Sequence, residues 1–392
     1  MSQFSQLVFD RNETPEELFS LLETLGEEYP ISDSGRGRKL EFRCIEAKET
    51  VSRVTRSTGK VLIEYSSVAA AGRGIGSALS KLEGEEKTPF KTLGILLDVS
   101  RNMVMKLDHL KRWLRRMSLS GYNLLMLYTE DVYQLPNEPF FGYMRGAYSL
   151  DDIKELDRYA GKLGIEVVGC IETLGHLEQI IRWRGAYGKI SDTAKVLMVD
   201  EPGTYELIEK MIAFWSEALS SRRININMDE THDLGRGKFL DHHGFEEPFE
   251  LFNRHLGKVN EICGSYGLTP MIASDMYFRL SNPDMIYYDL TSPIPEKVQK
   301  KIPKNVQLLY WDYYHKDADF YEKMIKRHRD IGFDPVMLSG IWTWTRMWYD
   351  HNQTSSTVVP CIQACRQNKV QELMFALFGD DGAYCNLSLI HI

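Results

Sequence analysis

The sequence predicts a parallel (β/α)8 TIM barrel preceded by a small α/β domain. Eight apolar, strand-like segments follow one another after about residue 90, most of them separated by helical patterns, and this alternation favours a parallel sheet covered by helices. Polar and aromatic residues gather where nearly every one of these strands ends, as the active face of a barrel requires. At 392 residues the chain also has room for a second domain, because a barrel takes about 250 residues. The competing architecture is an open doubly wound sheet.

Residues 1–90 are expected to form the small domain. The stretch TPEELFSLLETLGEEY predicts a helix with Thr14 as its cap and Pro15 at its first position. KVLIEYSSVAAA predicts a strand, and IGSALSKLEG a short helix after it. The charged run 83–89 has no apolar periodicity and is interpreted as a link, which places the domain boundary near residue 90.

The barrel domain is expected over residues 91–386. Its strands are predicted at 93–101, 122–131, 165–176, 223–231, 268–278, 306–315, 335–344 and 370–381, with an extra extended piece at 285–290. A helix is predicted over 149–164, opening on a capping box of Ser149 and Asp152 and closing on Gly164. If the last strand ends near Phe378, the closing eighth helix is missing from this chain.

Composition excludes several classes of protein. The net charge of −8 argues against nucleic acid as the main partner, and no segment approaches the roughly 20 apolar residues of a membrane span. The N-terminus lacks the basic and apolar regions of a secretion signal. Six scattered cysteines match neither zinc spacing nor a disulfide framework. A cytoplasmic location is therefore expected.

The last six residues, LSLIHI, follow without a turn or helix signal. One reverse translation of them is the transposon end used in sequencing adapters. We therefore expect residues 387–392 to be a non-native tail, with the natural chain continuing past Asn386.

Two adjacent acids end the fourth predicted strand. In RININMDE the period of two sends Ile224, Ile226 and Met228 to one face and Asn225, Asn227 and Asp229 to the other, toward the barrel axis. Glu230 would point away unless the strand curls at its end. Neighbouring like charges raise the pKa of one partner, which keeps a carboxylic acid protonated near neutral pH.

The segment INMDETHDLGRGKFL resembles the catalytic Asp–Glu segment of the family 20 glycoside hydrolases, the β-N-acetylhexosaminidases, and is most similar to the bacterial branch acting on GlcNAc and GalNAc. The resemblance covers about residues 92–386. It implies exo-acting, substrate-assisted retention, in which the 2-acetamido oxygen of the sugar attacks C1 and forms an oxazolinium intermediate. Glu230 would then be the general acid and base, and Asp229 would hold the acetamido N–H. No metal or other cofactor is implied.

Other site residues follow from the same resemblance. Arg101 matches an arginine that grips the 3- and 4-hydroxyls, and His176 matches a histidine linking the acid to an upstream carboxylate, for which Glu130 and Asp131 are both candidates. Tyr313 and Tyr310 both fit the tyrosine on the acetamido carbonyl. Asp275, Asp312 and Trp342 are further candidates because they lie at strand ends. Trp311 and Trp344 are expected to form the walls of the sugar site, because the C–H faces of a pyranose pack on aromatic rings. The resemblance also places Asp380 where the family has a glutamate that binds the 4- and 6-hydroxyls.

Some motifs in the sequence also allow other interpretations. AAAGRGIGSAL, at 69–79, resembles the glycine-rich phosphate loop of dehydrogenases, but that motif opens such folds at their first strand. The acids and histidines of 229–243 match no zinc spacing. A retaining glycosidase for another sugar and a non-catalytic carbohydrate-binding barrel remain alternatives.

Overall fold

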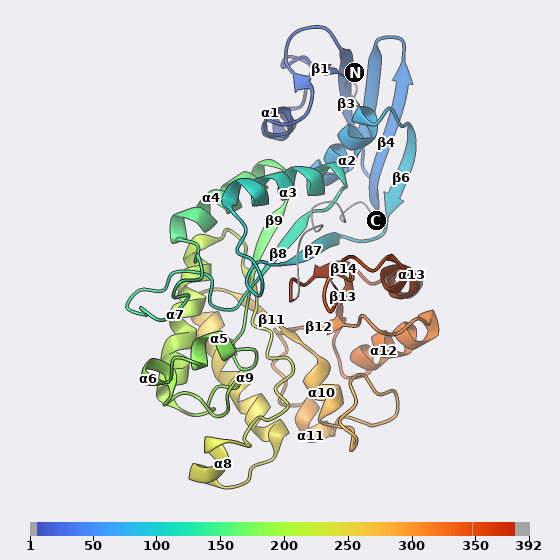
Figure 1. Ribbon diagram of the computed structural model, residues 1–392. Coiled ribbons are helices and arrows are strands. Elements are labelled where there is room, and N and C mark those ends of the chain that lie inside the picture. Colours follow the sequence, from blue (N-terminus) through green and yellow to red (C-terminus); the bar gives the residue numbers. More distant parts are fainter. Residues whose placement is uncertain (1–5, 347, 381–392) are drawn as a thin grey trace.

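The computed structural model describes residues 6–346 and 348–380, which form two sheets. The expected non-native tail at 387–392 lies outside the described residues, as do residues 381–386 of the expected barrel domain and the place where an eighth helix would follow. Figure 1 shows the small sheet (blue) at one end of the barrel.

The N-terminal sheet has the strand order β2-β1-β3-β5-β4-β6. Its strands are β1 (Leu7–Phe9), β2 (Ile31–Ser32), β3 (Arg38–Cys44), β4 (Thr50–Ser57), β5 (Lys60–Tyr65) and β6 (Gly84–Thr88). The prediction of a charged link at 83–89 is wrong, because β6 pairs antiparallel with β4. Its charges suit an edge strand, where Glu85 and Glu86 pair with Arg53 and Arg73.

The helices of this domain partly match the prediction. A 3-10 turn, η1 (Glu16–Leu18), precedes α1 (Phe19–Gly26), and the residue at the cap position of the turn is Pro15 rather than Thr14. The glycine-rich segment forms α2 (Val68–Leu79), which packs between the sheet and a barrel helix, α3 (Leu107–Leu119). A Cβ on Gly76 would stand 2.3 Å from the Leu119 carbonyl oxygen. The glycines therefore serve close helix packing, not a phosphate loop.

The second sheet is a closed barrel of eight parallel strands, as predicted. The strands are β7 (Thr92–Asp98), β8 (Leu124–Thr129), β9 (Glu166–Ile171), β10 (Arg223–Asn225), β11 (Thr269–Ala273), β12 (Gln307–Trp311), β13 (Val336–Gly340) and β14 (Glu372–Leu377). β14 pairs with β7, which closes the barrel. Almost every strand residue is buried, which explains the nearly continuous apolar runs in the sequence.

Long helices cover most of the strand connections. They are α3, α4 (Leu150–Lys162), α7 (Pro202–Ala218), α9 (Pro248–Ser265), α12 (Ala318–Asp330) and α13 (His351–Gln367), with short helices α5 (Glu178–Ile181), α6 (Arg184–Tyr187) and α8 (Lys238–His243) in the loops. The capping box of Ser149 and Asp152 is present at the start of α4. Between β11 and β12 only α10 (Asp275–Arg279) and α11 (Glu296–Gln299) form, and the expected extended piece at 285–290 is an irregular loop. This connection therefore reaches the active face as loop rather than as a long helix.

Candidate active site

A cavity of about 290 Å³ opens at the carboxyl ends of the barrel strands. Its volume is at the lower end of the range for small-molecule sites, which suits one sugar ring better than a chain. Most of the predicted site residues line it: Arg101, His176, Asp229, Glu230, Trp311, Tyr313, Trp342, Trp344 and Asp380. The structure therefore brings together residues from six of the eight strand ends.

The Asp229–Glu230 pair enters the cavity because the chain curls after β10. The strand ends at Asn225, and Asn227, Met228 and Glu230 all adopt positive φ values of 47°, 68° and 49°. Residues other than glycine rarely adopt this conformation, and it is often found at functional sites. The curl ends the alternation of faces, so that both carboxyl groups line the same cavity.

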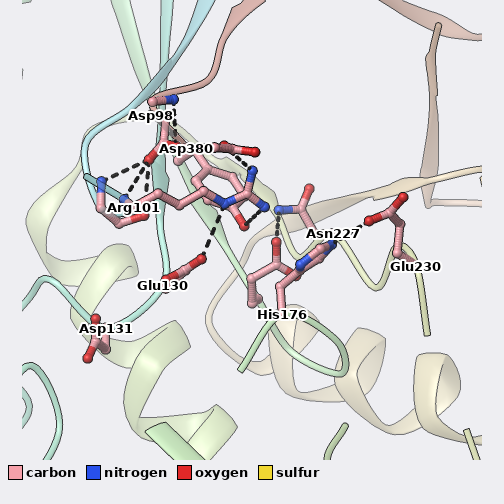
Figure 2. A network of polar contacts seen from close by, with 12 residues as sticks. Asp98, Arg101, Glu130, Asp131, His176, Asn227, Glu230 and Asp380 are labelled. Atoms are coloured by element: carbon pink, nitrogen blue, oxygen red, sulfur yellow. Dashed lines mark hydrogen bonds and ion pairs between the residues drawn. The ribbon is translucent and has the colours of Figure 1, made fainter. Parts of the chain in front are cut away.

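His176 lies between the two acids, as Figure 2 shows for Glu230. Its Nε2 is 3.5 Å from Asp229 Oδ2 and 3.2 Å from Glu230 Oε2. Burial alone would lower the pKa of His176, but Asp229 and Glu230 outweigh burial and raise it well above its usual value. The hydrogen bond from His176 lowers the pKa of Glu230 to about 2, against the effect of burial. This contact therefore favours a protonated His176 and an ionised Glu230.

Sequence reasoning missed two buried residues behind this pair. Asn227 Nδ2 donates to Glu172 Oε1 at 2.8 Å. Burial, followed by Asp229, raises the pKa of Glu172 well above its usual value, and Glu172 in turn helps to raise the pKa of His176. Glu172 stands four residues before His176 in the segment ETLGH. The sequence predicts this segment as the end of a strand, so the closeness of Glu172 to His176 is the signal that could have identified it.

Arg101 is fixed on the opposite side by three contacts (Figure 2). Its Nη1 is 2.9 Å from Asp380 Oδ1, its Nε is 3.4 Å from Glu130 Oε1, and its Nη2 donates to the Tyr128 hydroxyl at 3.0 Å. Asp98, at the end of β7, accepts the backbone N–H groups of Ser100 and Arg101. These contacts hold the guanidinium group beside the cavity before any ligand arrives.

The two candidate upstream carboxylates pair with arginines rather than with His176. Asp131 Oδ1 accepts from Arg145 Nε at 3.0 Å, and Glu130 lies between Arg101 and Arg145. Burial raises the pKa of Glu130 to about 7, and Arg101 opposes this shift. Among the acids with fully buried side chains, Glu172 helps to raise the pKa of His176, after Asp229 and Glu230.

Aromatic rings form the remaining wall of the cavity. Trp342 and Trp344 stack with ring centroids 4.3 Å apart, and Trp311 stacks on Tyr313 at 5.4 Å. Trp344 meets the edge of Tyr313 at 5.1 Å. Such apolar rings can pack against the C–H faces of a pyranose.

Three predicted residues lie behind the wall. Tyr310 points outward from β12 and stacks on His328, with its hydroxyl donating to Asp312. Asp312 also accepts the backbone N–H groups of Tyr314 and His315, and so fixes the loop after β12. Of the two candidate tyrosines, only Tyr313 lines the cavity.

Asp275, the third of these residues, hydrogen-bonds the backbone of the acid pair. Its Oδ2 accepts the backbone N–H of Glu230 at 3.1 Å. Burial, and then Asp229, raise the pKa of Asp275 well above its usual value. Two further tyrosines were not predicted: Tyr314 lines the cavity, and the Tyr287 hydroxyl donates to Glu230 Oε1 at 3.0 Å.

Neither a metal site nor a membrane span is found in residues 6–346 and 348–380. No group of three or more His, Cys, Asp or Glu side chains there is arranged to hold a metal ion. Within the same part of the chain, no helix has the length and apolar character needed to cross a membrane.

Solved structures of hexosaminidases share this fold. The family 20 β-N-acetylhexosaminidase of Streptomyces coelicolor A3(2) superposes with a TM-score of 0.67 at 16% identity, over 100% of this chain and 85% of that one. The β-N-acetylhexosaminidase of Bacteroides fragilis gives 0.68 at 14% identity, over 100% and 87%. A Streptomyces plicatus β-hexosaminidase mutant, solved with the product GlcNAc, gives 0.68 at 15% identity, over 100% and 84%.

Sequence comparison leads to the same group of proteins. No protein-family model matches the chain. Human hexosaminidase D is 24% identical over 302 residues, which cover 74% of this chain and 57% of the human protein, and bovine hexosaminidase D is 24% identical over 238 residues, 57% of this chain and 62% of the bovine protein. The chain thus spans less than two thirds of either curated relative. The chain therefore shares its fold with solved family 20 β-N-acetylhexosaminidases and is similar in sequence to the hexosaminidases D.

Proposed function

We propose that this protein is an exo-acting, retaining β-N-acetylhexosaminidase that removes terminal β-linked GlcNAc or GalNAc by substrate-assisted catalysis. The observation that carries the proposal is the placement of Asp229 and Glu230 on one cavity, both within 3.5 Å of His176 Nε2, with Arg101 lining the same cavity.

Each residue has a chemical role in this proposal. Asp229 Oδ1 accepts no hydrogen bond from any described residue, which leaves an acceptor for the acetamido N–H. Tyr313, on the aromatic wall, would donate to the acetamido carbonyl. Glu230 would protonate the leaving oxygen and then activate water, a contribution typically worth about 10²–10⁴-fold. His176 would supply the proton that the ionised Glu230 lacks.

The other end of the sugar would meet Arg101 and Asp380. The guanidinium offers five donors in a fixed fork for the 3- and 4-hydroxyls, and Asp380 offers acceptors for the 4- and 6-hydroxyls. Because the shorter Asp380 stands where the family has glutamate, we expect both C4 epimers to be accepted. The proposal also places the protein in the cytoplasm, which the five free cysteines found in the described residues support.

Paired aryl glycosides test this function. We expect turnover of aryl β-GlcNAc and aryl β-GalNAc, and inhibition by a GlcNAc-thiazoline. The aryl β-glucoside, which lacks the acetamido group and so the intramolecular nucleophile, should turn over at least about 10³-fold more slowly. Equal turnover of the glucoside would instead identify a glycosidase with its own nucleophile. Binding of GlcNAc without any hydrolysis would identify a carbohydrate-binding barrel.

A further inference from the structure

Both carboxyl oxygens of Glu230 already have a partner within the protein. Oε2 faces His176 Nε2 at 3.2 Å, and Oε1 accepts from the Tyr287 hydroxyl at 3.0 Å. Tyr287 comes from the irregular loop between α10 and α11, 57 residues further along the chain. A carboxylate held by two donors favours its ionised form, whereas a general acid needs the proton.

The Tyr287 hydroxyl has a second partner. It also hydrogen-bonds His232 Nε2, on the exposed side of the loop that carries Glu230. A hydroxyl has one proton to donate and can accept from other donors. Tyr287 can therefore donate to Glu230 while it accepts from His232, or donate to His232 Nε2 once Glu230 no longer needs the hydrogen bond.

We propose that Tyr287 and His232 form a positioning pair that stabilises the ionised form of Glu230 and releases it when Glu230 takes up its proton. This role of the pair extends the proposed function and depends on it. It would favour the step in which Glu230 acts as a base and oppose the step in which Glu230 acts as an acid, so that it sets the pH range of activity.

Other ionisable groups around Glu230 also act on its protonation equilibrium. The ionisable groups that act on Glu230 or on the pair come from several elements: His176 after β9, Asp275 at the start of α10, Tyr313 and Tyr314 after β12, and Arg279, Lys195 and Asp233 around His232 and Tyr287. Arg279 lies over the Tyr287 ring at 4.7 Å. Apart from Tyr287 itself, only His176 among these groups contacts the Glu230 carboxyl directly.

The variant Tyr287→Phe tests the pair through a pH profile. Without the hydroxyl, the proton shared by Glu230 and His176 is held more tightly, because ionised Glu230 has lost a donor. The alkaline limb of kcat/KM, which reports the free enzyme, should move to higher pH by about one unit. His232→Ala should move it in the same direction by less.

Tyr288→Phe is the matched control. It removes a buried hydroxyl from the neighbouring residue of the same loop, one that packs against Trp311 and whose hydroxyl faces Ser274 rather than Glu230. Its alkaline limb should stay where the wild-type limb lies. An unchanged limb in folded Tyr287→Phe overturns the proposal, and if that variant does not fold, an unchanged limb in His232→Ala does so.

A second readout separates this inference from the proposed function. The Glu230 carboxyl carbon can be titrated by ¹³C NMR in the wild type and in Tyr287→Phe without any substrate. We expect the midpoint to rise by about one pH unit in the variant. If the wild type hydrolyses no hexosaminide, the proposed function fails, and this titration still decides whether Tyr287 controls Glu230.

Discussion

Replacing Glu130 by glutamine should remove a loss of folding stability that develops as the pH rises. The Glu130 side chain is only 8% exposed, and burial raises its pKa from 4.5 to about 7 against the pull of Arg101. An acid with a higher pKa in the folded state binds more protons folded than unfolded, so stability falls as pH rises between the two pKa values. At 1.36 kcal/mol per pKa unit, the cost above pH 7 is about 3 kcal/mol.

Urea unfolding of the wild type and Glu130→Gln at pH 4 and pH 8 measures this cost. The difference in the free energy of unfolding between the two proteins cancels the contribution of the other titrating groups. Any contact that glutamine loses changes this difference equally at pH 4 and at pH 8. We expect the stability of the variant relative to the wild type to rise by about 3 kcal/mol from pH 4 to pH 8. Glu217→Gln, at a side chain that is 64% exposed, serves as the control. A relative stability that is constant, or that falls over this range, would refute the reasoning.

Three further predictions concern catalysis and packing. Glu230→Gln should lower kcat on aryl β-GlcNAc by about 10²–10⁴-fold with an unchanged thermal midpoint, and a variant retaining a tenth of the activity would contradict its role. Arg101→Lys should lower kcat/KM about 10²-fold, because an ammonium cannot reproduce the guanidinium fork; wild-type kinetics would count against sugar recognition by Arg101. Gly76→Ala should lower the free energy of unfolding by about 1–3 kcal/mol, since its Cβ would stand 2.3 Å from the Leu119 carbonyl oxygen, whereas Gly161→Ala, with open space around its Cβ, should not.

The barrel could be predicted because buried parallel strands have a simple signature. Apolar runs such as LGILLD leave little ambiguity when helical patterns separate them, and all eight strands begin close to where they were expected. Each ends earlier than predicted: β10 stops at Asn225 rather than at residue 231, and the end of the strand predicted at 268–278 forms α10. The charged run at 83–89 was wrongly predicted as a link, because an edge strand needs no apolar face. Its pairing with β4 depends on residues some thirty positions earlier, which no local pattern reveals.

The site was only partly predictable, for a related reason. Asp229 and Glu230 could be found from their position at a strand end, but the curl that brings both to one cavity needs positive φ at Asn227, Met228 and Glu230, which side-chain patterns do not indicate. Tyr287 lies in a loop that was expected to be extended. Its contact with Glu230 spans 57 residues and depends on how the β11–β12 connection folds.

The central claim is that the acetamido group of the substrate performs the attack. Aryl β-GlcNAc substrates whose N-acetyl group carries zero, one, two or three fluorine atoms test it most directly, because each fluorine makes the acyl oxygen a weaker nucleophile. We expect kcat/KM to fall at every step of the series. A flat series, measured on protein that turns over the parent substrate, would contradict the account.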